Sequence, residues 1–454
     1  MKRSSGILLP IFSLPSKYGC GSLGKEAYNF IDFLVDAKQS YWQMLPINHT
    51  GYGNSPYCCF SSFAGNPVFV DLDMLKEEGL LDGFDLDSID FGSNPSHIDY
   101  EKLFEGRKKA LHYAFEHNKE NIVFNPAWFV SYAEFMSAKE GDSTEFYRFV
   151  QYHFYKQWAK LKAYANERGI KLIGDVPVYV PLDSADVYAE PQFFLLNEKN
   201  VPTEVAGVPP DYFNEDGQLW GNPLYDWERM KNDGYGWWIR RIDGTLQLFD
   251  LVRIDHFRGF DSYWAVPYGE KTAKVGRWLQ GPGMGFVGVI CSWFGKEHFI
   301  AEDLGILTES VRNLLKESGL PGMKILEFAF DPKANSAYLP HNYSDSNCIC
   351  YVGTHDNAPI MQWRDEASEE ELQFAMDYCN TSKEDLNWGV IKTGMQSTAD
   401  LFIAQMQDFL GLGKESRTNI PGEALGNWTF RIKKEDLSKE LSEKIAYLTG
   451  LYGR

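Results

Sequence analysis

Arg253 and Asp255 are the pair of residues in this sequence whose types and spacing most clearly suggest chemistry. They follow the mostly apolar run 248–252, which predicts a buried strand with an arginine and a carboxylate at its far end. Side chains alternate along a strand, so both residues should face the same side. The positive charge of Arg253 is expected to lower the pKa of Asp255 and keep it ionised. An ionised carboxylate is what a glycosidic nucleophile requires, although a structural ion pair would show the same spacing.

Three further apolar runs of strand length also end in acidic residues, at positions 170–175, 298–303 and 350–356. The carboxylates of interest are those of Asp175, Glu302 and Asp356. The segments between these runs are long enough for a helix and a loop. Parallel strands that alternate with helices and carry functional residues at their carboxyl ends are typical of a TIM barrel. The sequence therefore predicts an α/β fold, a (β/α)8 TIM barrel with helical and loop insertions.

Further strands are expected where other short apolar runs occur between turn signals. After the strand at Tyr351, the chain is expected to be mostly helical up to about residue 411. The additional strands are predicted in residues 5–10, 41–47, 323–328 and 427–430.

The expected domain organisation is a single catalytic barrel that spans residues 1–454, because no linker divides the chain. A charged stretch followed by a strong helical pattern predicts an inserted helical subdomain at about 72–168. A stretch rich in proline, glycine and aromatic residues predicts a long active-site loop at about 201–227.

The composition limits the possible partners of the chain. Its 454 residues and hydrophobic fraction of 44% suffice for a large core. The formal net charge of −19 argues against nucleic acid as a partner, because nucleic acids are polyanions. A neutral sugar would not be repelled, and the aromatic fraction of 15% supplies flat faces for sugar rings. No apolar run is long enough to span a membrane, so no membrane partner is expected.

The start of the chain and the cysteines point to the cytoplasm. Lys2, Arg3 and the apolar stretch after them mimic a signal peptide, but Pro10 and Pro15 interrupt it and no clear cleavage site follows. The seven cysteines show no Cys-x-x-Cys pair, which indicates reduced thiols in a cytoplasmic protein. No zinc-binding spacing occurs, and neither a metal nor a cofactor is expected.

A series of short motifs identifies a family, because they occur in the family's order over most of the chain. In these motifs the chain resembles the 4-α-glucanotransferases known as amylomaltases or disproportionating enzymes. The motifs are Asn54–Tyr57, Ala64–Pro67, Gly174–Pro177, Asp183–Val187, Gly207–Phe213, Trp220–Tyr225, Arg253–Gly259, Ala301–Gly305, Leu320–Met323, His341–Tyr343 and Gly353–Asn357.

The resemblance implies a retaining transfer of α-glucan segments and assigns catalytic roles. Asp255 matches the family's nucleophile, and Glu302 matches its general acid/base. Asp356 matches a third carboxylate that holds sugar hydroxyls near the transition state. Arg253 and His355 match residues that support these carboxylates.

The resemblance also implies residues that bind the substrate on both sides of the cleaved bond. Tyr57 matches an aromatic residue that lines the donor site. Asp211, Gln218 and Trp220 fall in the loop that covers the acceptor side in the family. The expected partners are α-1,4-glucans and malto-oligosaccharides. The other predicted substrate-binding residues are Ser55, Asp175, Asn222 and His341.

The chemistry of retention supports the two main assignments independently of the resemblance. Retention requires two carboxyl groups with different pKa values. Glu302 follows the apolar residues 299–301, and apolar surroundings should raise its pKa and keep it protonated. Arg253 should in turn hold Asp255 ionised.

Three functions are compatible with these residues. The first is a transglycosylase that acts on α-1,4-glucans. The second is an amylase-like hydrolase with the same carboxylates, in which water instead of a sugar resolves the intermediate. The third is a non-catalytic glucan-binding protein, against which the presence of three carboxylates argues, since binding alone does not require them.

Overall fold

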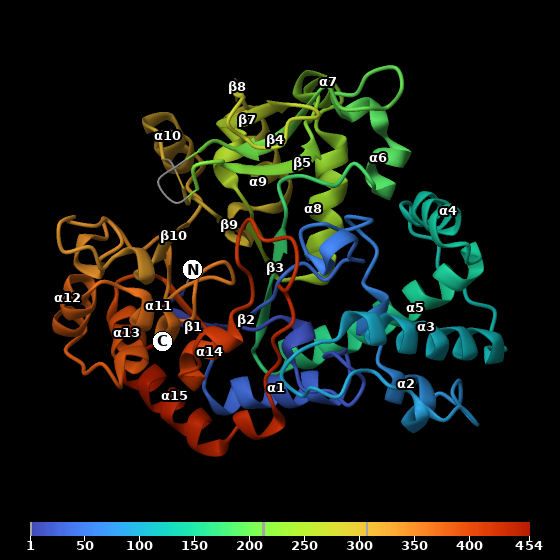
Figure 1. Ribbon diagram of the computed structural model, residues 1–454, viewed down its shortest axis with the longest axis horizontal. Coiled ribbons are helices and arrows are strands. Elements are labelled where there is room, and N and C mark those ends of the chain that lie inside the picture. Colours follow the sequence, from blue (N-terminus) through green and yellow to red (C-terminus); the bar gives the residue numbers. More distant parts are fainter. Residues whose placement is uncertain (1, 211–213, 306) are drawn as a thin grey trace.

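The computed structural model describes residues 2–210, 214–305 and 307–454, and its centre is a barrel of eight parallel strands (Figure 1). In order around the barrel the strands are β1 (Ser4–Leu8), β2 (Tyr41–Gln43), β3 (Lys171–Val176), β6 (Leu251–Ile254), β9 (Phe299–Ala301), β10 (Gly322–Ile325), β11 (Cys348–Tyr351) and β12 (Leu401–Gln405). Ladders of hydrogen bonds run from β10 through β12 and β1 to β9. Between β9 and β10, the backbone amide of Ala301 donates to the carbonyl of Pro321 at 2.9 Å. The predicted (β/α)8 barrel is confirmed.

The inside of the barrel is filled by one cluster of buried apolar side chains, to which all eight strands contribute. Because side chains alternate along a strand, the inward face continues from Ile173 to Asp175 on β3 and from Leu251 to Arg253 on β6. A polar layer therefore follows the apolar layer at the carboxyl end of the barrel. The apolar residues are Leu8, Tyr41, Ile173, Leu251, Ile300, Met323, Ile325, Ile349, Tyr351, Leu401 and Ile403.

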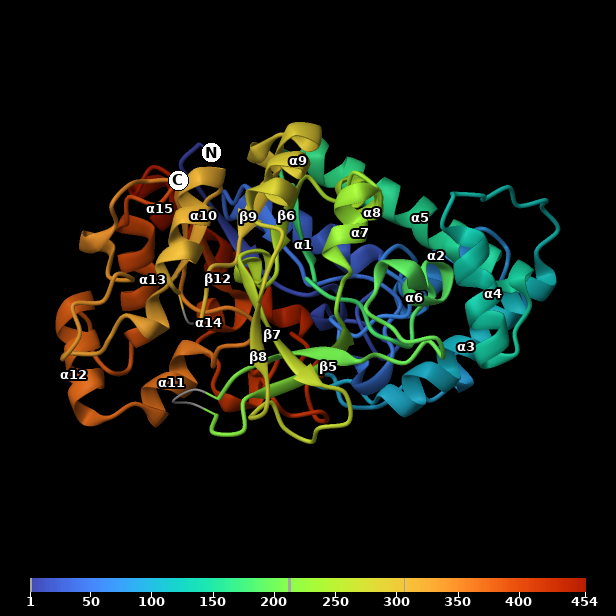
Figure 2. The same ribbon diagram turned by 90° about the horizontal axis from the view of Figure 1, so that it is seen from above.

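Helices surround the barrel in both views (Figures 1 and 2). In α1 (Lys25–Asp36), the buried residues Ala27, Phe30, Ile31 and Leu34 recur at helical spacing and form one apolar face. No helix in the described ranges is both long enough and apolar enough to cross a membrane. The further helices after α1 and around the barrel are α5 (Thr144–Glu167), α8 (Gly236–Leu248), α9 (Met284–Phe294), α10 (Glu309–Ser318), α11 (Ile360–Glu366), α12 (Glu369–Cys379), α13 (Leu386–Gln396), α14 (Met406–Leu410) and α15 (Lys439–Leu451).

The segment between β2 and β3 contains several helices. The helices α2 (Leu72–Glu77), α3 (Tyr100–His117) and α4 (Phe129–Glu140) precede α5 and extend to one side of the barrel (Figure 1). Ser143 begins α5, because its hydroxyl accepts a hydrogen bond from the backbone amide of Phe146 at 3.2 Å. The indole of Trp158 in α5 donates to the carbonyl of Leu248 at 2.9 Å and so ties this segment to the chain before β6.

A second sheet contains part of the segment that was predicted to be a long loop at about 201–227. This sheet has the antiparallel order β5-β4-β7-β8. The hairpin of β4 and β5 lies within the predicted loop, so strands replace part of that loop, while β7 follows the carboxyl end of β6 closely in the chain. The short helices α6 (Ala185–Ala189) and α7 (Trp227–Asn232) flank the hairpin in the sequence. The four strands are β4 (Glu204–Val208), β5 (Gln218–Pro223), β7 (Ser262–Pro267) and β8 (Arg277–Gln280).

The last barrel strand lies at a different place from the predicted one. The strand expected at 427–430 is wrong: Phe430 forms only an isolated bridge to His97, and Trp428 has a positive φ of 63°. The eighth barrel strand is β12, within the stretch that was predicted to be mostly helical. In the sequence, its short apolar run lies between α13 and α14 with few intervening residues, so it was included in the predicted helical stretch.

Candidate active site

The guanidinium of Arg253 lies at the centre of the polar layer and contacts three carboxylates. Its Nη1 atom donates to Asp175 Oδ2 at 2.6 Å and to Asp255 Oδ1 at 3.2 Å. Its Nη2 atom lies 3.9 Å from Oε2 of Glu302. The Arg253 side chain is only 2% exposed. The ends of β3, β6 and β9 therefore bring together four residues that the sequence analysis singled out.

Burial dominates the electrostatics of these carboxyl groups. It raises the pKa of Glu302 to about 8 and that of Asp175 to about 7, against the opposing charge of Arg253. The raised pKa expected for Glu302 is confirmed. Arg253 lowers the pKa of Asp255 as expected, but burial has the larger effect, so the pKa of Asp255 is raised overall and not lowered as predicted. One guanidinium shared among three carboxylates does not offset the loss of water around Asp255.

The third predicted carboxylate, Asp356, follows β11 in a turn. His355 Nε2 lies 3.3 Å from Asp356 Oδ1, and burial lowers the pKa of His355 to about 4, so its ring is neutral at neutral pH. Asn419 Nδ2 donates to the same Asp356 oxygen at 2.6 Å. Asp356 is 43% exposed, so its carboxylate is available to a ligand while two side chains hold it.

Tyr57 lies in the loop after β2 and contacts both Asp175 and His355. Its hydroxyl donates to Asp175 Oδ2 at 2.8 Å. Its ring stacks on that of His355, with centroids 5.3 Å apart and an interplanar angle of 15°. The ring of Trp428 lies 6.1 Å from both the Tyr57 and the His355 rings. Three aromatic rings thus form one wall beside the carboxylates.

A cleft of about 860 Å³ lies next to this group, and Glu302, whose side chain is 12% exposed, is not among the residues that line it. Asp255 and Asp356 line it, together with the loops that carry Tyr57 and Trp428. Trp220 also lines the cleft, and its ring meets that of His256 edge-on at 4.9 Å. The other predicted binding residues that line the cleft are Ser55, Gln218 and Asn222.

Three predicted substrate-binding residues do not line this cleft in the described structure. The side chain of Asp175 is 0% exposed and is buried against Arg253. His341 is exposed, its Nδ1 lies 2.8 Å from the hydroxyl of Tyr378 in α12, and it is not among the residues that line the cleft. Asp211 lies outside the described residues.

Two residues of the site were missed by the sequence analysis, Asn419 and Trp428. Both belong to the segment 419–428, whose last two residues fall within the strand predicted at 427–430. The segment lies far from the barrel motifs in sequence and meets Asp356 only in three dimensions. The one sequence signal for a loop at this place is the turn formed by Pro421 and Gly422.

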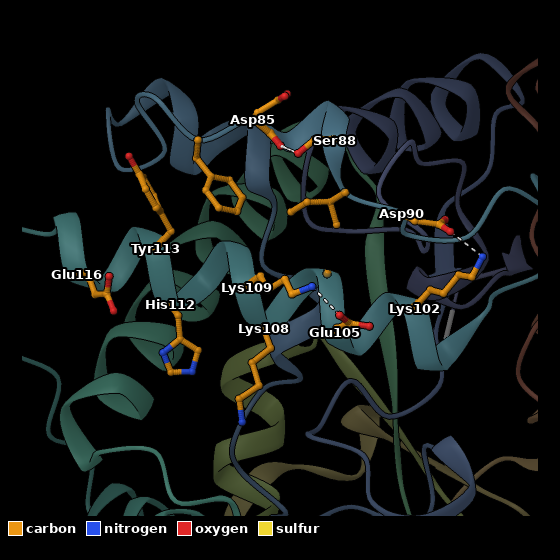
Figure 3. A pocket seen from close by; sticks show the side chains of 13 residues that line it. Asp85, Ser88, Asp90, Lys102, Glu105, Lys108, Lys109, His112, Tyr113 and Glu116 are labelled. Atoms are coloured by element: carbon orange, nitrogen blue, oxygen red, sulfur yellow. Dashed lines mark hydrogen bonds and ion pairs between the residues drawn. The ribbon is translucent and has the colours of Figure 1, made fainter.

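A second hollow, of about 970 Å³, lies on α3 and shares no lining residue with the cleft (Figure 3). Two ion pairs lie in it: Lys102 with Asp90 at 2.6 Å, and Lys109 with Glu105 at 2.5 Å (Figure 3). The carboxylates that line it are all exposed on the surface, in contrast to the buried carboxyl groups around Arg253. The cleft at the barrel mouth is therefore the candidate active site.

Comparison with known proteins gives a consistent result. The family model described as 4-alpha-glucanotransferase matches residues 9–142 and 131–437. The 4-alpha-glucanotransferase of Clostridium butyricum is 44% identical over 98% of this chain and 99% of its own. The corresponding protein of Streptococcus pneumoniae is 42% identical over 100% of this chain and 98% of its own. The structure of amylomaltase from Streptococcus agalactiae in complex with acarbose has a TM-score of 0.96 and 38% identity, and the match covers 100% of both chains.

The sequence motifs, the barrel fold and the similar proteins all indicate the same family, and the matches extend over most of the chain. The chain belongs to the 4-alpha-glucanotransferase family of glycosyl-transferring enzymes.

Proposed function

We propose that this cleft transfers segments of α-1,4-glucans to acceptor malto-oligosaccharides with retention, through a covalent glycosyl-aspartate at Asp255. The observation that carries the proposal is the pair of carboxyl groups of Asp255 and Glu302 on one buried guanidinium. Retention uses one such group as nucleophile and the other as acid and then base. The motif matches support the same assignment.

The proton shared by this pair belongs on Glu302 before reaction. Arg253 is nearer to Asp255, at 3.2 Å, than to Glu302, at 3.9 Å, and so favours the ionised form of Asp255 more. Asp255 is also more exposed, at 24% against 12%, and is less penalised for its charge. The two groups titrate as a pair, and both differences assign the negative charge to Asp255.

In the first step, an oxygen of Asp255 attacks the anomeric carbon of the donor sugar. The glycosidic bond breaks, and Glu302 gives its proton to the departing oxygen. In the second step, Glu302 takes the proton of an acceptor hydroxyl, whose oxygen attacks the same carbon and displaces Asp255. Two inversions at one carbon give overall retention.

The surrounding residues are proposed to position the sugar and the carboxylates. Asp356 would accept hydrogen bonds from sugar hydroxyls, because it is exposed to the cleft and held by His355 and Asn419. Arg253 and Asp175 would fix the nucleophile, and Tyr57 would present a flat face to the donor sugar.

On the acceptor side, we assign binding roles to the hairpin of β4 and β5 and to nearby loops. Trp220 offers an aromatic face, and its indole donates to Gln218 Oε1 at 3.1 Å, which fixes the orientation of the ring. Ser55 and Asn222 line the same cleft. The family resemblance alone supports roles for Asp211 and His341.

For the chain as a whole, we propose one catalytic domain over residues 1–454. The helical segment at about 72–168 is the insertion in this domain, and the segment at about 201–227 covers the active site. Its hairpin supports this placement, since Gln218 and Trp220 of β5 line the cleft.

The nucleophile is tested by incubation of the wild type and of Asp255→Asn with maltotriose. The wild type should produce glucose and a ladder of longer chains. Asp255→Asn should fold but lose turnover by far more than about tenfold, because a neutral amide cannot form the glycosyl ester. Circular dichroism checks the fold, and retention of turnover within about tenfold would contradict the assignment.

The acid/base role is tested by the pH dependence of kcat/KM on maltotriose. The protonated form of Glu302 starts the reaction and its pKa is about 8, so kcat/KM should fall as pH rises through about 8. Above that value the fall should approach about tenfold per pH unit, as expected for one required proton. A flat profile up to about pH 10 in an enzyme that remains folded would exclude this role for Glu302.

The contribution of Trp220 is tested by the ratio of transfer to hydrolysis at fixed maltotriose. Trp220→Ala should lower this ratio, because an acceptor sugar loses the face that holds its hydroxyl near the attacked carbon. Trp293→Ala is the matched control, since Trp293 lies on α9 with 66% exposure and does not line the cleft. Equal ratios in the two variants would show that Trp220 does not control the choice between sugar and water.

A further inference from the structure

Glu327 is a buried carboxyl group that the reaction above does not use. It lies in a single turn of 3-10 helix, Leu326–Phe328, directly after β10. Its backbone amide donates to the carbonyl of Val352 at 3.1 Å, which joins this turn to the end of β11. A Cβ atom added at Gly353 would lie 3.2 Å from Glu327 Oε2. The carboxyl group is therefore packed against the turn that carries His355 and Asp356.

That turn, residues 354–357, is held closed by Asn357. The Asn357 Oδ1 atom accepts hydrogen bonds from the backbone amide and from the hydroxyl of Thr354, both at 2.9 Å. The same hydroxyl accepts a hydrogen bond from the backbone amide of Asp356 at 3.3 Å. The other end of the amide, Nδ2 of Asn357, lies 3.5 Å from Glu327 Oε1. Thr354 and Glu327 thus contact the two ends of the Asn357 amide, so the position of Glu327 is coupled to the turn through Asn357.

The other side of the turn is held by a different set of groups. Arg417 Nη2 donates to the backbone carbonyl of Asp356 at 3.1 Å. Asn419 Nδ2 donates to the Asp356 carboxylate at 2.6 Å. Asp356 is consequently gripped between Asn419 and Arg417 on one side and the Asn357–Glu327 pair on the other. A shift of either side would turn its carboxylate.

The surroundings of Glu327 favour the protonated, neutral form of its carboxyl group. Burial raises its pKa to about 8, and the nearby carboxylates of Asp408 and Glu366 add to this effect, while the hydrogen bond from Asn357 and the charge of Arg417 oppose it. Its Oε2 atom is buried and has no hydrogen-bond partner among the described residues. A buried polar atom without a partner costs free energy, and such groups are concentrated at functional sites.

We propose that Glu327 is a positioning residue that holds the 354–357 turn through Asn357 and thereby sets the direction in which Asp356 presents its carboxylate to the cleft. This inference rests on the proposed binding role of Asp356.

The first test compares the kinetics of Glu327→Ala and Glu327→Gln on maltotriose. Glu327→Ala should lower kcat by roughly 10- to 100-fold with a smaller change in KM, because misplacement of a transition-state contact by about 1 Å costs this much. Glu327→Gln keeps the shape and the acceptor oxygen and should restore most of kcat. Glu105→Ala is the matched control, because Glu105 pairs with Lys109 on the surface of α3, does not line the cleft and should leave kcat unchanged. If Glu327→Ala does not fold, Glu327→Leu fills the same space without an acceptor and is used instead.

The second test is a double-mutant cycle with Asp356→Asn. If Glu327 acts through Asp356, then Glu327→Ala should add almost nothing to the loss caused by Asp356→Asn. Losses that multiply would overturn the inference, as would equal defects in Glu327→Ala and Glu327→Gln. If Asp356→Asn alone keeps the wild-type rate, the proposed role of Asp356 fails. In that case a crystal structure of Glu327→Ala still decides the inference, because an unmoved 354–357 turn contradicts it.

Discussion

The structure of this site depends on one buried positive charge, the guanidinium of Arg253. A charge without water must be paired, and loss of one partner of a buried pair typically costs about 3–5 kcal/mol. Asp175 meets this need because the ladder between β3 and β6 places it directly opposite Arg253 in register. A shift by one residue would turn Arg253 toward the surrounding helices and leave Asp175 unpaired. The pairing therefore favours the same register that the apolar interior of the barrel requires.

The same guanidinium influences which of two carboxyl groups, Asp255 or Glu302, carries the proton. It cannot neutralise Asp175, Asp255 and Glu302 fully, so their pKa values rise with burial. Under these conditions small differences in distance and exposure decide where the proton lies. One protonated and one ionised carboxyl group at the ends of adjacent strands is the arrangement that retaining glycoside chemistry uses. The loops that line the cleft then determine which ligands reach the carboxyl groups, since Tyr57, Trp220 and Trp428 offer flat faces around them.

The part of the site that could be predicted from the sequence is the part attached to barrel strands. Arg253, Asp255 and Glu302 follow short apolar runs, and the alternation of a strand fixes the side that they face. The site residues Asn419 and Trp428 could not be found in this way, because their loop meets Asp356 only after the barrel has closed. The hairpin of β4 and β5 was predicted as a loop because glycine, proline and aromatic residues conceal its period of two. The raised pKa of Asp255 depends on burial, which local sequence does not reveal.

In the proposed mechanism, Asp255 forms a covalent bond to the sugar while Glu302 transfers protons. Mass spectrometry of Glu302→Gln after incubation with an α-maltotriosyl fluoride tests it most directly, because fluoride leaves without protonation and the second step lacks its base. We predict a glycosyl adduct on the peptide that contains Asp255, and no adduct in the variant that also carries Asp255→Asn. An adduct on another residue, or turnover by Glu302→Gln with inversion at the anomeric carbon, would rule out these roles for Asp255 and Glu302.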